Sequence, residues 1–145
     1  MLYCDTSILV PLFLHEATSG RVERFFSRQP EGELSISHWS CIEFSSLLAR
    51  DVRMGLFSSK MALEIDTEFE AMVAASFFTI LPTINDFSLA RQFLQRHETK
   101  LRGGDALHLA IASNHGARAI YSLDQGVLKA GRLLGLPVDS GIRLP

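Results

Sequence analysis

Short apolar runs recur along the chain and are separated by longer stretches. The first run, residues 2–4, ends at a polar turn, and similar runs follow at 34–36, 77–81, 118–122 and 136–138. Apolar runs of this length, bounded by polar, Gly or Pro residues, are typical of buried β-strands. The pattern therefore predicts five short strands.

The stretches between these runs carry apolar residues at helical spacing. The predicted helices are 18–29, 37–54, 58–75, 85–97, 105–115 and 124–134. In the second helix we expect Ile42, Leu47 and Leu48 to face inward. Short strands alternating with helices predict an α/β fold, a parallel sheet flanked by helices on both faces.

Composition narrows the class of protein. A length of 145 residues favours one domain over 1–145, and 47% hydrophobic with 21% charged residues excludes disordered and fibrous classes. No signal peptide and no apolar run of about 20 residues is present, which predicts a cytoplasmic domain without a membrane span. A net charge of -2 excludes a generally basic nucleic-acid-binding surface. Arg21, Arg24 and Arg28 share one helix face and could either hold phosphates or form a solvated surface.

Four acidic residues fall where a ligand of a parallel sheet would bind. Asp5 ends the first strand, Glu43 lies early in the helix after the second, Asp105 opens a helix, and Asp124 follows the strand at 118–122. Each alone has an ordinary explanation as a cap, a turn residue or an exposed helix residue. Because ligands gather at the carboxyl ends of parallel strands, we expect the four to face one crevice.

The mutual repulsion of four clustered carboxylates must be offset by a positive charge. Two carboxylates about 5 Å apart repel by roughly 3 kcal/mol at an effective dielectric of about 20. A hard divalent cation such as Mg²⁺ or Mn²⁺ removes this repulsion and prefers oxygen ligands. The acids therefore predict a metal site for phosphoryl chemistry.

The same residues resemble a known family. The segment 2–7 (LYCDTS), the helix that carries Glu43, the segment 105–112 (DALHLAIA) and the segment 122–124 (SLD) resemble the PIN-domain ribonucleases, and most closely the VapC-type toxins. The resemblance implies a PIN-like, Rossmann-like α/β/α sandwich and Mg²⁺- or Mn²⁺-dependent cleavage of RNA. It also implies a homodimer and inhibition by a small VapB-like antitoxin.

The resemblance also implies roles for single residues. Asp5, Glu43, Asp105 and Asp124 take the catalytic and metal-binding positions, and the hydroxyls of Thr6 and Ser122 orient carboxylates or water from behind. His108 lies three residues after Asp105. For it we expect a role in helix packing or at the surface, because a metal can itself supply the hydroxide that a base would otherwise make.

Several other functions are excluded and two remain open. The chain lacks the Asp-x-Asp of dehalogenase-like phosphatases, the Gly-x-Gly-x-x-Gly of dinucleotide sites and the Gly-x-Ser-x-Gly of serine hydrolases. An RNA-processing nuclease outside a toxin–antitoxin pair remains possible, as does a non-catalytic acidic pocket for a basic partner.

The helix 58–75 has a wide apolar stripe, formed by Met61, Ile65, Phe69, Met72 and Val73. We expect it to fill the core and to leave a surface for a dimer or an antitoxin helix.

Overall fold

The computed structural model describes all 145 residues and confirms the predicted α/β class. Five strands form one parallel sheet in the order β3-β2-β1-β4-β5. They are β1 (Leu2–Cys4), β2 (Leu34–Ser37), β3 (Phe78–Ile80), β4 (Ala119–Tyr121) and β5 (Val138–Asp139). All five predicted strands are present, with ends shifted by at most two residues.

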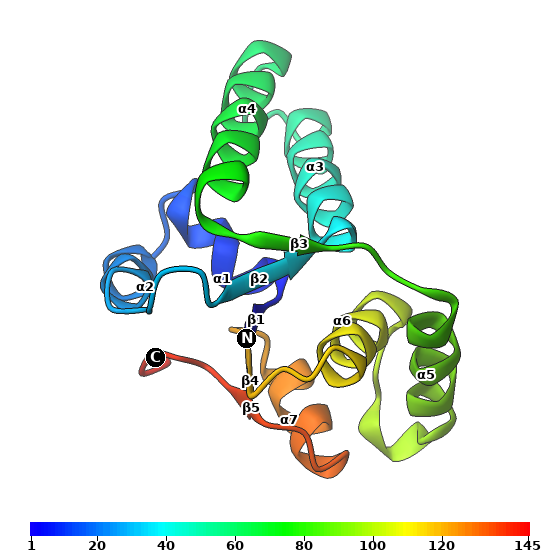
Figure 1. Cartoon of the computed structure of the whole chain (residues 1–145). Helices are drawn as coiled ribbons and strands as arrows, with labels where there is room; N and C mark the ends of the chain where they lie inside the picture. Colours follow the sequence, from blue (N-terminus) through cyan, green and yellow to red (C-terminus); the bar gives the residue numbers. More distant parts are fainter.

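Seven α-helices connect the strands and cover the sheet (Figure 1). They are α1 (Thr6–Leu9), α2 (Ser19–Phe26), α3 (His38–Arg53), α4 (Ser59–Ser76), α5 (Ile84–Gln95), α6 (Gly103–Asn114) and α7 (Gln125–Leu133). Two short 3₁₀ segments, η1 (Val10–Leu12) and η2 (His97–Thr99), complete the chain. The helix α1 and both 3₁₀ segments were not predicted, because a single turn is too short to show a helical repeat. None of the helices is both long and apolar enough to cross a membrane.

Each face of the sheet has its own hydrophobic core. The strand β1 shows the division, since Leu2 and Cys4 pack against α1 to α4, whereas Tyr3 packs against α5, α6 and α7. In Figure 1 these helix groups lie on opposite sides of the sheet. Alternate residues of a strand point to opposite faces, so one short central strand contributes to both cores.

The helices α3 and α4 pack as an antiparallel pair against the core that contains Leu2 and Cys4. Phe44 and Phe69 stack with ring centroids 4.1 Å apart, and Val73 is also buried. The prediction that Ile42 faces inward is wrong, because its side chain is 62% exposed. The stripe on α4 fills the core only in part, since Met61 is 49% exposed.

Parallel strands place their carboxyl ends at one edge of the sheet, and three central connections leave from that edge. The strand β1 leads into α1, β2 leads into α3, and β4 leads into α7. The residues that follow these strands are therefore held side by side, although they are far apart in the sequence.

Candidate active site

Asp5 follows β1 and caps the helix α1. Its Oδ1 accepts hydrogen bonds from the backbone N–H of Ser7 at 2.9 Å and of Ile8 at 3.4 Å, and from the hydroxyl of Ser7 at 2.6 Å. The carboxylate is only 3% exposed, and burial raises the pKa of Asp5 despite these bonds and the nearby His108. Cap bonds thus engage one oxygen and leave Oδ2 without a partner.

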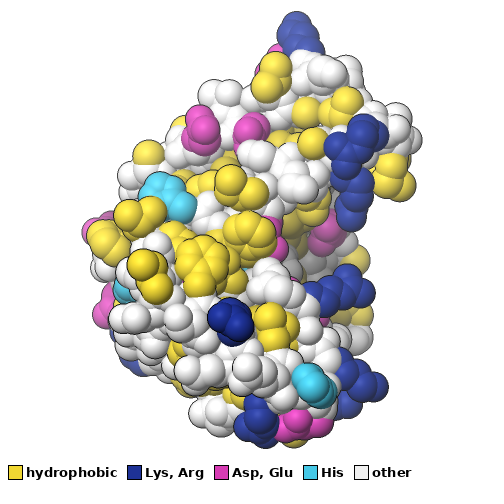
Figure 2. Space-filling view, turned by 90° about the vertical axis from the view of Figure 1, so that its right-hand side faces the viewer, with side chains coloured by type: hydrophobic (Ala, Val, Ile, Leu, Met, Phe, Trp, Pro, Cys, Tyr) yellow, Lys and Arg dark blue, Asp and Glu magenta, His cyan; other side chains and the backbone are white.

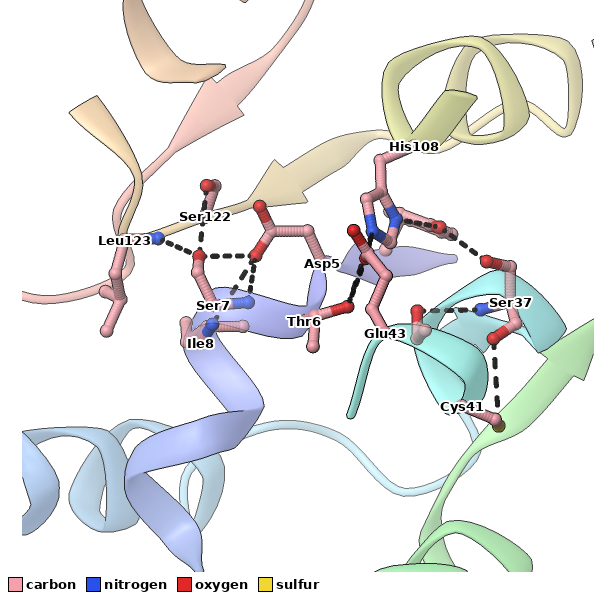
Figure 3. Close-up of polar contacts among 12 residues, drawn as sticks. Asp5, Thr6, Ser7, Ile8, Ser37, Cys41, Glu43, His108, Ser122 and Leu123 are labelled. Carbon is pink, nitrogen blue, oxygen red and sulfur yellow. Dashed lines mark hydrogen bonds and ion pairs between the residues drawn. The ribbon is translucent and has the colours of Figure 1, made fainter. Parts of the chain in front are cut away.

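Asp124 follows β4 and caps α7 in the same way. Its Oδ1 accepts from the backbone N–H of Gly126 at 2.7 Å and of Val127 at 3.1 Å. The buried Ser122 hydroxyl accepts from the backbone N–H of Asp124 at 3.1 Å and lies 3.2 Å from the Ser7 hydroxyl. Ser7, which the sequence did not single out, therefore joins the loops after β1 and β4 (Figure 3).

Glu43 lies in the second turn of α3 and is held by two side chains. Its Oε1 accepts from the Thr6 hydroxyl at 2.6 Å and is hydrogen-bonded to Nε2 of His108. Burial alone would raise the pKa of Glu43, but the hydrogen bond and charge of His108, together with the Thr6 hydroxyl and the nearby Trp39 N–H, lower it below its usual range. Thr6 thus orients a carboxylate, but that of Glu43 and not that of its neighbour Asp5.

Asp105 lies in the first turn of α6 and has no hydrogen-bond partner of its own. Burial, followed by the charges of Asp124, Asp5 and Glu43, raises the pKa of Asp105 to about 6, although His108 opposes the shift. The predicted helix began at this residue, whereas α6 begins at Gly103. The four acids are therefore close enough to influence one another's ionisation.

All four acids line one cavity of about 220 Å³ at the carboxyl edge of the sheet. Its walls are Asp5, Thr6, Ser7, Val10, Glu43, Leu47, Asp105, His108 and Asp124. Of the residues that the sequence analysis assigned to the site, only Ser122 does not line the cavity, because its side chain is fully buried. The structure thus brings the predicted acids together.

The donor set fits a hard divalent cation. The acidic side chains that line the cavity offer only oxygen, and Asp5, Glu43 and Asp124 each keep one oxygen free of hydrogen bonds. Asp105 has no hydrogen-bond partner for its side chain, and burial together with the charges of the other acids raises its pKa to about 6. No three of the site's acidic or histidine side chains converge on a single point, however. Side-chain movement is therefore required for several of them to bind one ion.

Of the two roles expected for His108, in helix packing or at the surface, the structure leaves the first. It is 2% exposed, so a surface role is wrong, and it contacts Glu43 directly. Its ring also meets the Tyr3 hydroxyl, with 2.7 Å between Nδ1 and the phenolic oxygen. Its position three residues after Asp105, on one helix face, was the only signal in the sequence.

A second hollow of about 430 Å³ continues from Glu43 along α3. It is lined by Trp39, Ile42, Glu43, Ser46, Leu47, Arg50 and Arg53. Figure 2 views the side of the molecule on which α3 and α5 lie in Figure 1, and it shows Lys and Arg side chains along one edge, next to an apolar centre. By contrast, Arg21, Arg24 and Arg28 line a separate hollow beside the C-terminal residues.

Comparison with known proteins identifies the fold. A family model described as PIN domain matches residues 2–133. The chain is similar to Mycobacterium tuberculosis VapC20, described as a sarcin-ricin loop cleaving toxin, with a TM-score of 0.71, 23% identity, and coverage of 90% of this chain and 95% of that chain.

Two further solved structures share this fold at lower identity. VapBC2 from Rickettsia felis, bound to a promoter DNA fragment, has a TM-score of 0.68 and 14% identity, covering 96% of this chain and 98% of that chain. FitAcB from Neisseria gonorrhoeae has a TM-score of 0.67 and 14% identity, covering 97% and 98%. A search of curated proteins finds no match.

Proposed function

The chain belongs to the PIN domain family, and on that basis we propose that it is an endoribonuclease that hydrolyses RNA phosphodiester bonds with a bound Mg²⁺ or Mn²⁺ ion. In this proposal residues 1–145 act as a single PIN domain, and Asp5, Glu43, Asp105 and Asp124 are the catalytic and metal-binding residues. The observation that carries the proposal is the cavity that these four acids share.

In this proposal one oxygen of a carboxylate is held by hydrogen bonds within the protein, and the other is left to bind the metal ion. Asp5 and Asp124 each use one oxygen to cap a helix, which fixes the position of the other oxygen. Thr6 and His108 fix Glu43 in the same manner, while Ser122 supports the loop of Asp124. When bound, a divalent ion would polarise the scissile phosphate and lower the pKa of a water molecule. Asp105 has no hydrogen-bond partner within the protein, so a cation would supply the partner that its carboxylate lacks.

We further propose that this nuclease is the toxin of a VapBC-type toxin–antitoxin pair and acts on RNA in the cytoplasm. Its fold is shared with VapC20 and with VapBC2, which supports a VapB-like antitoxin as the partner. A groove of about 340 Å³ between α3 and α4, with Leu48, Ala49, Val52, Ala62 and Leu63 in its walls, offers an apolar surface for an antitoxin helix. The exposed Leu81, Ile84 and Phe87 offer a surface for the second subunit of a homodimer.

Incubation of the purified protein with total RNA and Mg²⁺ or Mn²⁺, followed by mapping of the cut ends, tests the proposed activity. The variant Asp5→Asn should abolish cleavage and still fold, because the amide oxygen can accept the same cap hydrogen bonds. The matched control is Asp66→Asn, which changes a half-buried acid that accepts a hydrogen bond from Ser45 outside the cavity. Full activity in Asp5→Asn, or cleavage that persists in EDTA, would contradict the metal site.

Two outcomes would favour the other functions. Binding of basic peptides without any RNA cleavage would indicate a non-catalytic acidic pocket. Cleavage that the product of a neighbouring small open reading frame does not inhibit would indicate an RNA-processing nuclease outside a toxin–antitoxin pair.

A further inference from the structure

His108 is a polar residue in the most buried segment of the chain. Every residue from Ala106 to Ala112 on α6 is buried, and His108 is the only one with a polar side chain. A buried imidazole is destabilising unless both ring nitrogens have hydrogen-bond partners. The partners of His108 therefore indicate why a polar ring is placed there.

Both nitrogens of the ring are satisfied by side chains from distant elements. Nε2 meets Oε1 of Glu43 on α3, and Nδ1 lies 2.7 Å from the hydroxyl of Tyr3 on β1. A carboxylate only accepts hydrogen bonds, so Nε2 must donate to Glu43. A phenol can donate or accept, so Tyr3 can serve Nδ1 in either protonation state of that nitrogen.

Tyr3 is itself fixed in place. Its side chain is fully buried, and its hydroxyl lies 3.0 Å from Oγ of Ser37 as well as 2.7 Å from Nδ1. Because a phenol has one hydrogen, it donates to one of these two groups and accepts from the other. Because both partners of the hydroxyl belong to regular elements, the phenol cannot rotate away without losing two hydrogen bonds. A chain of bonds therefore runs from Ser37 through Tyr3 and His108 to Glu43.

The result is a Glu43 carboxylate with one fixed and one free oxygen. Thr6 and His108 both bond Oε1. Oε2 has no partner with hydrogen-bond geometry, although the buried indole N–H of Trp39, itself without a partner, lies beside it. A Cβ atom built on Gly104 would come within 3.1 Å of Oε2 and 3.2 Å of the Trp39 ring. Glycine at this position therefore leaves the space beside Oε2 open.

We propose that His108 and Tyr3 are positioning residues that hold Glu43 through Oε1 and so present Oε2 to a divalent cation. This inference rests on the proposed function, since it assigns the free oxygen to the metal of that site. Neither residue needs to touch the metal or the RNA. Their contribution is to remove the rotational freedom that Glu43 would otherwise lose when the ion binds.

The direct measurement is the dissociation constant for Mn²⁺, obtained from the electron paramagnetic resonance signal of the free ion. His108→Leu keeps the site apolar and removes both ring nitrogens, and it should weaken Mn²⁺ binding about 10- to 100-fold. Tyr3→Phe removes a single hydroxyl and should weaken binding about fivefold, the usual effect of one lost hydrogen bond. His108→Gln retains an N–H donor for Glu43 and should restore binding to within about threefold of wild type.

The chain offers a matched control for each variant. His115→Leu removes a histidine at the other end of α6, where Nε2 bonds Asp86 and not the site. Tyr121→Phe removes a hydroxyl on β4 that has no hydrogen-bond partner in the structure. Both controls should bind Mn²⁺ as wild type does.

In RNA cleavage, the kcat of His108→Leu should be lower than that of wild type at limiting Mn²⁺ and should return to it at saturating Mn²⁺. The KM for RNA should not change.

The outcomes separate this inference from the function on which it rests. A wild-type protein that binds no Mn²⁺ overturns the proposed function, and the inference with it. Wild-type affinity that is retained in folded His108→Leu and in Tyr3→Phe overturns the inference alone. If His108→Leu does not fold, Tyr3→Phe decides, because it removes only the hydroxyl and conserves the shape of the buried ring.

Discussion

Asp105 is the one acid of the site without a hydrogen-bond partner for its side chain. Burial and the neighbouring carboxylates, Asp124 first among them, raise its pKa to about 6, whereas in the unfolded chain it lies near 3.9. The folded state therefore binds a proton that the unfolded state releases. Stability from this group is fully present below the unfolded pKa and is lost as the pH rises through about 6.

Asp105→Asn should accordingly stabilise the protein in EDTA at pH 7.5, by about 1–2 kcal/mol once solvent screening of this half-exposed carboxyl is allowed for. The advantage over wild type should widen between pH 4 and about pH 6.5 and stay constant above that range. Urea unfolding across this pH range measures it, with Asp66→Asn as the control. A difference in stability that does not change with pH would show that burial and the neighbouring carboxylates do not raise the pKa of Asp105.

Among single residues, the sequence indicated the acids but not their partners. Asp5, Glu43, Asp105 and Asp124 could be found because each follows a strand or lies near the start of a helix. The bonds of His108 could not, because Glu43 and Tyr3 are 65 and 105 positions away in the chain. Local periodicity carries no information about such pairs. The Oε1 bond of Thr6 to Glu43, across 37 positions, was missed for the same reason.

The helices α2 and α3 each carry two arginines, and they differ in how close these lie to the acids. The sequence pointed to α2, but its arginines line a hollow away from the acids, where Arg21 donates to the carbonyl of Arg143 at 2.6 Å. The last turn of α3 carries Arg50 and Arg53 in the hollow that continues from Glu43. Helical periodicity predicts which residues share a face but not which face lies near the site.

Arg53→Glu should therefore weaken RNA binding and lower the slope of log affinity against log salt by about one. Arg50 is a poorer test because it pairs with the buried Asp51, which its loss would leave unpaired. Fluorescence anisotropy with a labelled RNA in the Asp5→Asn background measures binding without cleavage. The control Arg24→Glu on α2 should bind RNA as the Asp5→Asn protein does. A larger effect in Arg24→Glu than in Arg53→Glu would show that α2, and not α3, binds the phosphates.

For the molecule as a whole, alternation of short apolar runs and amphipathic stretches was enough to predict the sheet and six of its seven helices. It succeeded because buried parallel strands are continuously apolar and cannot be confused with polar connections. It could not predict α1, a single turn whose start depends on the cap bonds of Asp5. That turn matters to function, because it carries Thr6 and Ser7 into the cavity.

The same cavity makes a specific kind of inhibition possible. Four carboxylates with unsatisfied oxygens attract a guanidinium or ammonium group as well as a metal ion. An antitoxin whose helix lies in the groove between α3 and α4 could place a basic side chain among the acids. Metal and antitoxin would then compete for the same oxygens, and each would weaken the binding of the other.

If this chain is the toxin of a VapBC-type pair, as proposed, we expect its antitoxin to abolish RNA cleavage and excess Mn²⁺ to restore part of it. The reason is that an ion and a basic side chain cannot both neutralise the free oxygens of Asp5, Glu43 and Asp124. Cleavage assays across a series of Mn²⁺ and antitoxin concentrations measure this, with Na⁺ at equal ionic strength as the control for general screening. Inhibition that does not depend on Mn²⁺ would show instead that the antitoxin blocks the path of the RNA without entering the acidic cavity.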